Sequence, residues 1–387
     1  MTAKGSAAMG IGKHLILFVV TEDWYFVSHR LAMARAARTA GFRVVVATRI
    51  SCHGDAIRRE GFELVDIPTL RRALPIWREP VTVLRLIALM RSLRPSIVHL
   101  VALKPVLFGT IAARFAGAPP IVNTMTGLGF VFTSNSLKAR TLRPIISTAL
   151  RLLLGHETVH IVVQNREDQR LLLENGILRQ ERSSLILGSG VDCAHFRPLP
   201  EPAGAFTCAA VCRMLGDKGV FDLIAACRLL RDQGHPVRLL LAGPTDLLNP
   251  TAISDSELRG WEREGIAEWL GPVKDVRDVW RQAHAAVLPS HREGLPKALL
   301  EAAACGRPIV TTDTTGCREV VSDGINGLLV PLRSPSSLAE ALSRLAADPA
   351  ARRRMGEAGR LRAEEFFSEA VVSAQTVDLY RRLAALP

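Results

Sequence analysis

The chain has 387 residues, of which 48% are hydrophobic and 22% are charged, and it contains no low-complexity tract. This composition is typical of a globular protein and excludes a disordered chain, while the length suits two domains rather than one. The uncharged apolar runs of about 18–20 residues that a transmembrane helix needs are absent, and the seven cysteines include no CxxC pair. We therefore expect a cytoplasmic protein without disulfides.

Positive charge is concentrated in the first half of the chain. Residues 1–200 hold 26 Lys and Arg against 13 Asp and Glu, whereas residues 201–387 hold 23 against 24. Residues 101–150 contain no acidic side chain and five basic ones, which are Lys104, Arg114, Lys138, Arg140 and Arg143. This bias predicts an anionic partner, and a membrane surface or a phosphate fits better than nucleic acid, because the chain has only two tyrosines and no recognised nucleic-acid-binding module. Solvated helix faces without a partner are the alternative.

Short runs rich in β-branched residues predict six strands in the first half, with helical patterns between them. The strands are expected at residues 14–20, 42–49, 62–68, 96–103, 120–126 and 159–165. The first helix is expected over residues 28–41, with Ser28 as its N-cap and Gly41 at its end. Strands that alternate with helices predict an α/β domain with a doubly wound parallel sheet.

The alternation stops at residues 190–206, a stretch rich in Pro and Gly that we interpret as a linker. A last amphipathic helix, over residues 368–386, has no strand after it and could pack back on the first domain. The predicted domains are residues 1–195 and 205–365, followed by the helical segment 366–387. The second domain is again expected to be doubly wound, with strands at residues 206–213, 237–243, 269–273, 285–290, 307–313 and 327–331 and helices that include 219–234 and 295–306.

Two glutamates, Glu293 and Glu301, surround a predicted helix start near Leu295 and Pro296. Ligands of open α/β sheets bind beyond the carboxyl ends of strands, where the N–H groups of helix N-termini could hold a phosphate oxygen. A carboxylate beside such an anion site suits the hydroxyl groups of a sugar, because it accepts two O–H hydrogen bonds. For Glu293, a favourable interaction with the helix dipole is the alternative.

Arg213 and Lys218 occupy the loop between another predicted strand and its helix. Two cations at the carboxyl end of a strand could neutralise a diphosphate, although exposed loop charges of this kind are also ordinary. Cys208 and Cys212 are four residues apart, but no matching pair of His or Cys follows them, so we expect no metal site.

Residues 206–335 resemble the donor-binding half of the retaining GT-B glycosyltransferases of family four. The resemblance rests on RMLGDKG at 213–219, LAGP at 241–244, LGPVKDV at 270–276, EGLPKALLEA at 293–302 and GCREVVSDGINGLLVP at 316–331. Glu293 and Glu301 reproduce the family's pair of glutamates separated by seven residues. The resemblance implies two Rossmann-like parallel-sheet domains that face a cleft.

The resemblance also implies a nucleotide-sugar donor, with UDP as the leading choice, and no metal or other cofactor. Arg213 and Lys218 would then contact the diphosphate, Glu301 the ribose hydroxyls and Glu293 the transferred sugar. The backbone of residues 294–297 and the loop from Gly271 to Lys274 would contact the rest of the donor; these segments comprise Gly294, Leu295, Pro296 and Lys297, and Gly271 and Val273.

Residues 21–49, 94–109 and 124–132 resemble a branch of the same family that elongates lipid-diphosphate-linked sugars in bacterial polysaccharide assembly. The resemblance implies that Arg30 and Lys104 bind the acceptor phosphate. The chain departs from the family at Thr21-Glu22-Asp23, where many relatives have Gly-Gly, and at Thr126, where many have His. Candidates on the acceptor side are Asp23, His29, His99 and Thr126, each with a structural role as the alternative; His99 fits a core histidine.

These observations predict a retaining enzyme that moves a hexose or N-acetylhexosamine from a UDP-sugar to a polyprenyl-diphosphate-linked saccharide at the inner face of the cell membrane. In family members the leaving phosphate is thought to take the proton of the acceptor. A nucleotide-sugar epimerase, a phosphorylase or a donor-binding subunit without catalysis are the alternatives. A dehydrogenase, a P-loop enzyme and a GxSxG hydrolase are set aside because their motifs are absent from the positions that they need.

Overall fold

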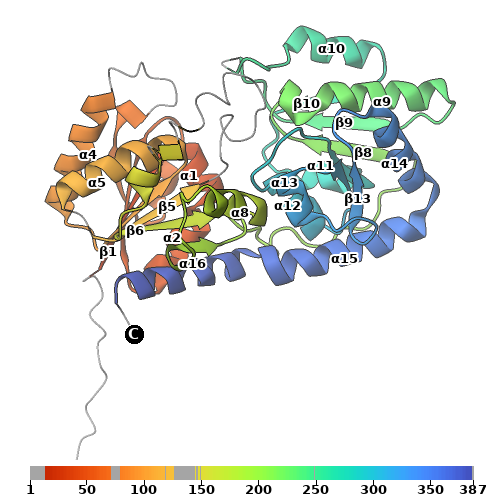
Figure 1. Cartoon of the computed structure of the whole chain (residues 1–387). Coiled ribbons are helices and arrows are strands. Elements are labelled where there is room, and N and C mark those ends of the chain that lie inside the picture. The colour runs from red at the N-terminus through yellow and green to blue at the C-terminus, as the bar shows by residue number, and fades with distance from the viewer. Residues whose placement is uncertain are drawn as a thin grey trace, which may run out of the picture. The chain divides into compact units, whose positions relative to one another are not determined.

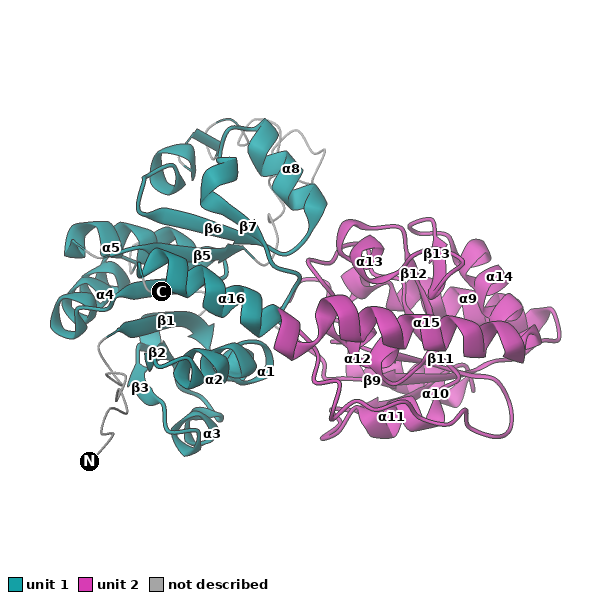
Figure 2. Ribbon diagram, turned by 90° about the horizontal axis from the view of Figure 1, so that it is seen from below, with its two compact units in different colours: residues 1–189, 372–387 teal, residues 190–371 magenta. Residues whose placement is uncertain are grey.

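The computed structural model describes residues 14–70, 79–117, 119–125, 144, 147, 148, 150–247 and 249–385. The chain forms two compact units, which Figure 2 shows in different colours. Unit 1 comprises residues Met1–Ser189 and Val372–Pro387, and unit 2 comprises Gly190–Val371. The stretch interpreted as a linker therefore belongs to unit 2, and most of the last predicted helix belongs to unit 1.

Unit 1, whose strands β1, β5 and β6 are labelled in Figure 1, is built on a seven-stranded parallel sheet in the order β3-β2-β1-β4-β5-β6-β7. Its strands are β1 (Leu15–Glu22), β2 (Arg43–Arg49), β3 (Glu63–Asp66), β4 (Ile97–Val101), β5 (Ile121–Met125), β6 (Val159–Val163) and β7 (Ser183–Leu185). The first six lie within the predicted ranges or extend them by two residues at most. Strand β7 was not predicted, because it is a three-residue edge strand that begins with two serines.

Helices accompany the unit 1 sheet, as the doubly wound prediction required. They are α1 (Asp23–His29), α2 (Leu31–Thr39), α3 (Gly54–Arg59), α4 (Glu79–Leu93), the π-helical turn η3 (Pro105–Gly109), α5 (Thr110–Ala116), α8 (Arg166–Glu174) and α16 (Glu369–Leu383), with 3₁₀ turns η1 (Pro68–Leu70) and η4 (Gln180–Arg182). Strands β4, β5 and β6 are buried along their whole length, as expected for strands that pack on both faces.

The predicted helix start at Ser28 is wrong. Helix α1 begins at Asp23, directly after β1. The helical conformation is interrupted at Arg30, and α2 begins at Leu31. Ser28 lies inside α1, where its hydroxyl donates to the carbonyl of Trp24 at 2.9 Å. A serine can bond back to the preceding helical turn as well as cap a helix, so its identity alone did not decide its position.

Helix α16 is attached to unit 1 through a buried hydrogen-bond chain. Tyr380 lies 2.5 Å from Nδ1 of His99, and Nε2 of His99 lies 2.6 Å from the hydroxyl of Thr124. Burial, with a smaller contribution from the charge of Arg30, holds the pKa of His99 well below its ordinary value, so the ring is neutral. Both ring nitrogens are engaged inside the core, which favours the structural role for this residue.

Unit 2 is built on a six-stranded parallel sheet in the order β10-β9-β8-β11-β12-β13. Its strands are β8 (Thr207–Val211), β9 (Arg238–Ala242), β10 (Glu268–Gly271), β11 (Ala285–Leu288), β12 (Ile309–Thr312) and β13 (Gly327–Val330). Its helices are α9 (Val220–Asp232), α10 (Asp255–Arg263), α11 (Arg277–Gln282), α12 (Lys297–Ala304), α13 (Thr315–Val320), α14 (Pro335–Ala347) and α15 (Pro349–Phe367), with the 3₁₀ turn η5 (Gly216–Lys218). All six strands overlap the predicted ones. Among the described residues, no helix is both long enough and apolar enough to cross a bilayer.

The buried His99 predicts a pH dependence of stability. The pKa of His99 is depressed in the folded state, so below its unfolded pKa of about 6.5 only the unfolded chain gains the proton, and stability falls as pH is lowered. Between about pH 7.5 and about pH 5, the free energy of unfolding of wild type should fall by up to about 2 kcal/mol more than that of His99→Gln. Urea titrations followed by circular dichroism measure this difference. The exposed His235 supplies the control His235→Gln, which should keep the wild-type slope; an equal slope in His99→Gln would contradict the assignment.

Candidate functional site

The unit 2 sheet has a topological switch point between β8 and β11. These strands are neighbours, but the chain adds β9 and β10 on one side and β12 and β13 on the other. The loops that follow β8 and β11 therefore depart in opposite directions, and such points are where open α/β sheets bind ligands. The loop after β8 carries Arg213 and Lys218, and the loop after β11 carries Glu293.

The structure brings Lys218 and Glu293 into direct contact. The ammonium of Lys218 lies 2.5 Å from a carboxylate oxygen of Glu293, and their side chains are only 21% and 11% exposed. The loop after β11 is also tied to the residue before Lys218, because the backbone N–H of His291 and the hydroxyl of Ser290 both donate to the carbonyl of Asp217, at 2.9 and 3.1 Å. Two residues 75 positions apart thus form one site.

Arg213 is held by a carboxylate that the sequence did not single out. Its guanidinium lies 2.6 Å from Asp246, which lies in the loop after β9. The two side chains are 37% and 28% exposed, so the pair contributes little to stability. It does orient the guanidinium at the carboxyl edge of the sheet, where an incoming anion would compete with Asp246.

Two glycines let the loops of this edge approach one another. Gly219 has φ +72°, and a Cβ at this position would lie 1.9 Å from the carbonyl oxygen of Pro289 at the end of the β11 strand. A Cβ on Gly316, in α13, would lie 2.4 Å from the carbonyl oxygen of Gly294 and 2.7 Å from that of Glu293. The loop after β11 is therefore packed against the backbone of Gly219 at Pro289 and against the backbone of Gly316 at Glu293 and Gly294. A side chain at either glycine would not fit.

Glu301 projects from α12, the helix that follows the Glu293 loop. The helix begins at Lys297, with Pro296 in an extended conformation as its N-cap, one position later than the predicted start. Burial, opposed by Lys297 and aided by smaller contributions from the acids Asp275 and Glu369, raises the pKa of Glu301 to about 7. This carboxyl group is thus close to half-protonated at neutral pH, unlike an ordinary surface glutamate.

Gly271 and Val273 lie at the same edge of the sheet but away from the switch point. Gly271 ends β10 with φ +65°, and its carbonyl accepts the N–H of Gly243 at 2.8 Å. Val273 is partly buried in the loop that leads to α11. Since β9 separates β10 from β8, these residues suit the far end of an extended ligand.

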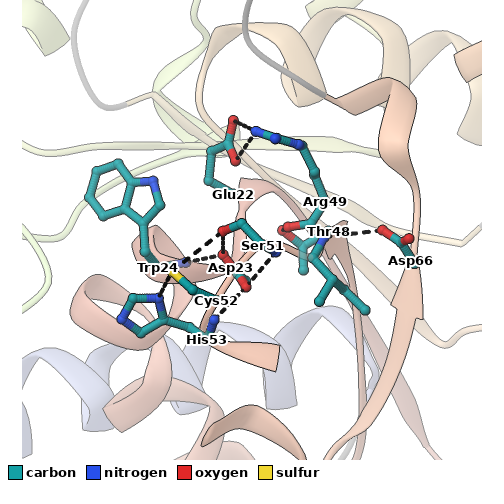
Figure 3. Close-up of polar contacts among 10 residues, drawn as sticks. Glu22, Asp23, Trp24, Thr48, Arg49, Ser51, Cys52, His53 and Asp66 are labelled. Atoms are coloured by element: carbon teal, nitrogen blue, oxygen red, sulfur yellow. Dashed lines mark hydrogen bonds and ion pairs between the residues drawn. The ribbon is translucent and has the colours of Figure 1, made fainter. Parts of the chain in front are cut away.

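Unit 1 has its own switch point, between β1 and β4. Asp23, which begins α1 there, is fully buried (Figure 3). Its carboxylate accepts hydrogen bonds from the backbone N–H groups of Trp24, Ser51 and His53 at 2.7–2.8 Å and from the Ser51 hydroxyl at 2.5 Å. Burial alone would raise the pKa of Asp23, but these hydrogen bonds outweigh it and hold the pKa below its ordinary value. Asp23 thus links α1 to the loop after β2, which favours the structural role for this residue.

The other predicted acceptor residues are dispersed in unit 1. His29 ends α1, where its ring stacks on Tyr25 with centroids 4.3 Å apart. Arg30 is 1% exposed, and none of its guanidinium nitrogens has a hydrogen-bond partner among the described residues. Lys104, just after β4, lies 2.8 Å from the buried Glu79 and donates to the carbonyl of Thr69 at 2.9 Å. Thr126, Lys138, Arg140 and Arg143 lie outside the described residues.

Comparison with known protein families identifies the family of the chain. A family model described as "Glycosyl transferases group 1" matches residues 205–348, and one described as "Glycosyl transferase 4-like" matches residues 15–170. The chain belongs to the glycosyltransferases. The group 1 match contains all the predicted donor residues, and the 4-like match contains all the acceptor candidates.

Individual glycosyltransferases are similar along most of the chain. The N,N'-diacetylbacillosaminyl-diphospho-undecaprenol alpha-1,3-N-acetylgalactosaminyltransferase of Campylobacter jejuni is 26% identical and covers 76% of this chain and 79% of its own. The UDP-Gal:alpha-D-GlcNAc-diphosphoundecaprenol alpha-1,3-galactosyltransferase of Escherichia coli is 24% identical over 73% and 74%. The solved structure of sucrose-phosphate synthase from Thermosynechococcus elongatus superposes with a TM-score of 0.79 at 21% identity, covering 96% of this chain and 100% of that one. The predicted GT-B fold, with two parallel-sheet α/β units, is confirmed.

Three features of this glycosyltransferase were missed at the sequence level. Asp246 holds Arg213, Asp222 lies 2.7 Å from His291 in the loop after β11, and Glu22 of β1 pairs with Arg49 of β2 at 3.2 Å. Each pair joins residues 27–69 positions apart. The available signal was that Asp246 and Glu22 come shortly after predicted strands; Asp222 lies inside a predicted helix, where its position gave no such signal.

Because Gly219 contacts Pro289, we expect a methyl group added at this position to lower the stability of unit 2 more than one added at a glycine in open space. Gly219→Ala should destabilise unit 2 by at least about 2 kcal/mol more than Gly234→Ala, measured by urea unfolding. Gly234 is the matched control, because it lies just past the other end of α9 with φ +81° and has open space where a Cβ would be placed. Equal losses in the two variants would show that only the positive φ matters and that the loops are not held in this contact.

Proposed function

We propose that this glycosyltransferase moves a hexose or an N-acetylhexosamine from a UDP-linked sugar to a polyprenyl-diphosphate-linked saccharide, with retention at the anomeric carbon, in cell-surface glycan assembly. The observation that carries the proposal is the convergence of Arg213, Lys218 and Glu293 on the switch point between β8 and β11, with Glu301 on the helix that follows. Cations, carboxylates and a helix N-terminus at one edge match the diphosphate and hydroxyl groups of a nucleotide sugar.

The leaving diphosphate is stabilised by positive charge that the protein has already placed. Arg213 and Lys218 lie on the loop after β8, and the N–H groups at the start of α12 add their dipoles. In the structure both cations are paired with carboxylates, Asp246 and Glu293. When a diphosphate binds, Lys218 turns to its oxygens, and Glu293 becomes available to accept hydrogen bonds from the transferred sugar. The scheme needs no metal ion or further cofactor.

Retention is supported by the state of the carboxylate at the unit 1 switch point. Asp23 is saturated with hydrogen bonds and has a lowered pKa, so it is poorly suited to accept the proton of an acceptor hydroxyl. An oxygen of the leaving diphosphate can take that proton on the face from which it departs, and the new bond then forms on the same face. No step of this scheme requires a protein base.

The choice of acceptor is supported by the relatives and by the basic character of the first 200 residues. The names of the relatives from C. jejuni and E. coli specify diphospho-undecaprenol-linked sugars, and the second also specifies UDP-galactose. A lipid-linked acceptor requires the enzyme to work at a membrane surface, and the net positive charge of residues 1–200 suits an anionic one.

Unit 1 exposes a surface of the kind that such a membrane would cover, which we call the α4–α5 face. It lies on α4, α5 and the helical residues 150–154; Arg91 of α4 donates to the carbonyl of Phe115, and Arg114 of α5 donates to that of Leu152. Its apolar members, Val81, Leu84, Phe115 and Leu152, are 45–74% exposed. Its basic members are Arg85, Arg91, Arg114 and Arg151, and the only acidic residue of α4, Glu79, is buried. Exposed apolar side chains among arginines are typical of a surface that lies on anionic lipid.

The function is tested by transfer from a panel of UDP-, GDP- and ADP-sugars to polyprenyl-diphosphate-linked saccharides in detergent. Wild type should transfer one sugar from a UDP donor, with the anomeric configuration retained by NMR. Because the pKa of Glu301 is about 7, lowering the pH from about 8 to about 6 protonates it and should weaken donor binding by up to about tenfold.

Glu301→Gln is the control for this test, because it cannot ionise. It should bind the donor more weakly at about pH 8 and lose most of the pH dependence. Binding of a nucleotide sugar without transfer to any acceptor would support the donor-binding subunit instead, and interconversion of the sugar itself would support the epimerase.

The α4–α5 face predicts membrane binding that two substitutions should abolish. Leu84→Ser combined with Phe115→Ser should reduce co-sedimentation with phosphatidylglycerol vesicles by about tenfold, because two exposed apolar anchors are lost. Leu361→Ser, on α15 of unit 2, removes a comparably exposed leucine and serves as the matched control. Co-sedimentation that the double variant leaves unchanged would refute the face as the membrane contact.

A further inference from the structure

An exposed tryptophan lies at the switch point of unit 1. Trp24 follows β1 directly, in the first turn of α1, and it is 45% exposed. The other tryptophans in the described part of the chain are Trp261, Trp269 and Trp280, which are buried or partly buried. A large aromatic ring at the carboxyl edge of the sheet, next to a switch point, is well placed to contact a ligand.

The position of this indole is set by its surroundings. The backbone N–H of Trp24 donates to Asp23, and Asp23 in turn holds Ser51 and His53 of the loop after β2 (Figure 3). The ring of Trp24 packs edge-to-face against Tyr25, with centroids 5.7 Å apart and an interplanar angle of 80°. A platform that is already ordered loses little conformational entropy when a ligand binds to it.

A charged pair lies at the same carboxyl edge of the sheet as Trp24. Glu22 is the last residue of β1 and Arg49 the last of β2, and their side chains are 3.2 Å apart (Figure 3). The glutamate is 15% exposed and the arginine 36% exposed, so both can still reach a ligand. Together they offer carboxylate acceptors and guanidinium donors at one edge, with no net charge.

This combination fits a neutral sugar better than a phosphate or an anionic lipid. A pyranose ring presents C–H groups with partial positive charge on its faces, which suit the negative face of an aromatic ring, and hydroxyl groups at its rim, which suit Glu22 and Arg49. A phosphate or an anionic headgroup would be repelled by Glu22, which cancels the charge of Arg49.

We propose that Trp24, Glu22 and Arg49 form the platform that binds the saccharide of the acceptor, with Trp24 stacked on its terminal sugar. The assignment rests on the proposed function, since it places the acceptor at the carboxyl edge of unit 1. It gives the Thr21-Glu22-Asp23-Trp24 segment a specific role: Glu22 and Trp24 contact sugar, while Asp23 between them positions both through the backbone.

Acceptor kinetics of Trp24→Ala and Trp24→Phe test the platform, with the acceptor that wild type accepts and at saturating donor. Trp24→Ala should raise KM for the acceptor by at least about tenfold, while kcat and the KM for the donor stay within about threefold of wild type. Trp24→Phe keeps an aromatic face and should recover most of the loss. Phe366→Ala, which removes a comparably exposed aromatic from α15 of unit 2, should leave these constants unchanged.

A second readout uses binding alone. The lipid-free saccharide released from that acceptor should shift the tryptophan emission of wild type, and Trp24→Phe should abolish the shift. A KM for the acceptor that is unchanged in Trp24→Ala, in a variant with normal circular dichroism, overturns the platform while leaving the proposed function in place. Absence of transfer by wild type to any acceptor overturns the proposed function and the platform with it.

Discussion

Reversal of the strand order in the middle of a parallel sheet is the constraint on which the sites of this protein depend. Adjacent parallel strands end at the same edge, and where the order reverses the two following loops must leave in opposite directions. In unit 2 this happens between β8 and β11, and in unit 1 between β1 and β4. Lys218 and Glu293 can meet only because of the first reversal, and Trp24 is left exposed at the second.

The carboxylates of the unit 2 edge have a role before any ligand binds. Arg213 and Lys218 lie close to the positive end of a helix dipole, and two uncompensated cations there would repel one another. Asp246 and Glu293 neutralise them in the structure. Because both pairs are partly exposed, each is weak enough to be exchanged for a diphosphate, whereas a fully buried pair would resist the exchange. Glu301 differs, since burial outweighs the lowering effect of Lys297 and raises the pKa of its carboxyl group to about 7.

The strands and the candidate site were predictable from the sequence to different degrees. Strands such as β1 and β9 contain continuous apolar runs, so their positions follow from the hydrophobic pattern. Arg213, Lys218 and Glu293 could be placed at one edge because they follow the carboxyl ends of two predicted parallel strands. The break at Arg30 and the short strand β7 were missed, because neither interrupts nor creates an apolar pattern.

Side-chain partners were the part that the sequence could not provide. Ion pairs such as Lys218 with Glu293 join residues that come together only after the sheet has formed, and several side chains could have reached either member. The same holds for Asp23. Of its three backbone partners, Trp24 is the next residue in the chain, whereas Ser51 and His53 lie in the loop after β2.

The two switch points differ in charge and in the kind of group that they expose, and this difference assigns them to different substrates. The edge of unit 2 presents two cations, the two carboxylates that an anionic ligand can replace as their partners, and the first turn of α12. This arrangement suits a ligand that carries concentrated negative charge. Among the described residues, the edge of unit 1 presents an aromatic face and an ion pair without net charge; Lys104 is paired with the buried Glu79, and Arg30 is itself buried. A donor diphosphate would gain little binding energy at the edge of unit 1, and a neutral saccharide at the edge of unit 2 would leave the two cations there without an anionic ligand. Because the charged groups and the aromatic surface lie at different edges, each edge suits only one of the two substrates, and no further specificity-determining feature is needed.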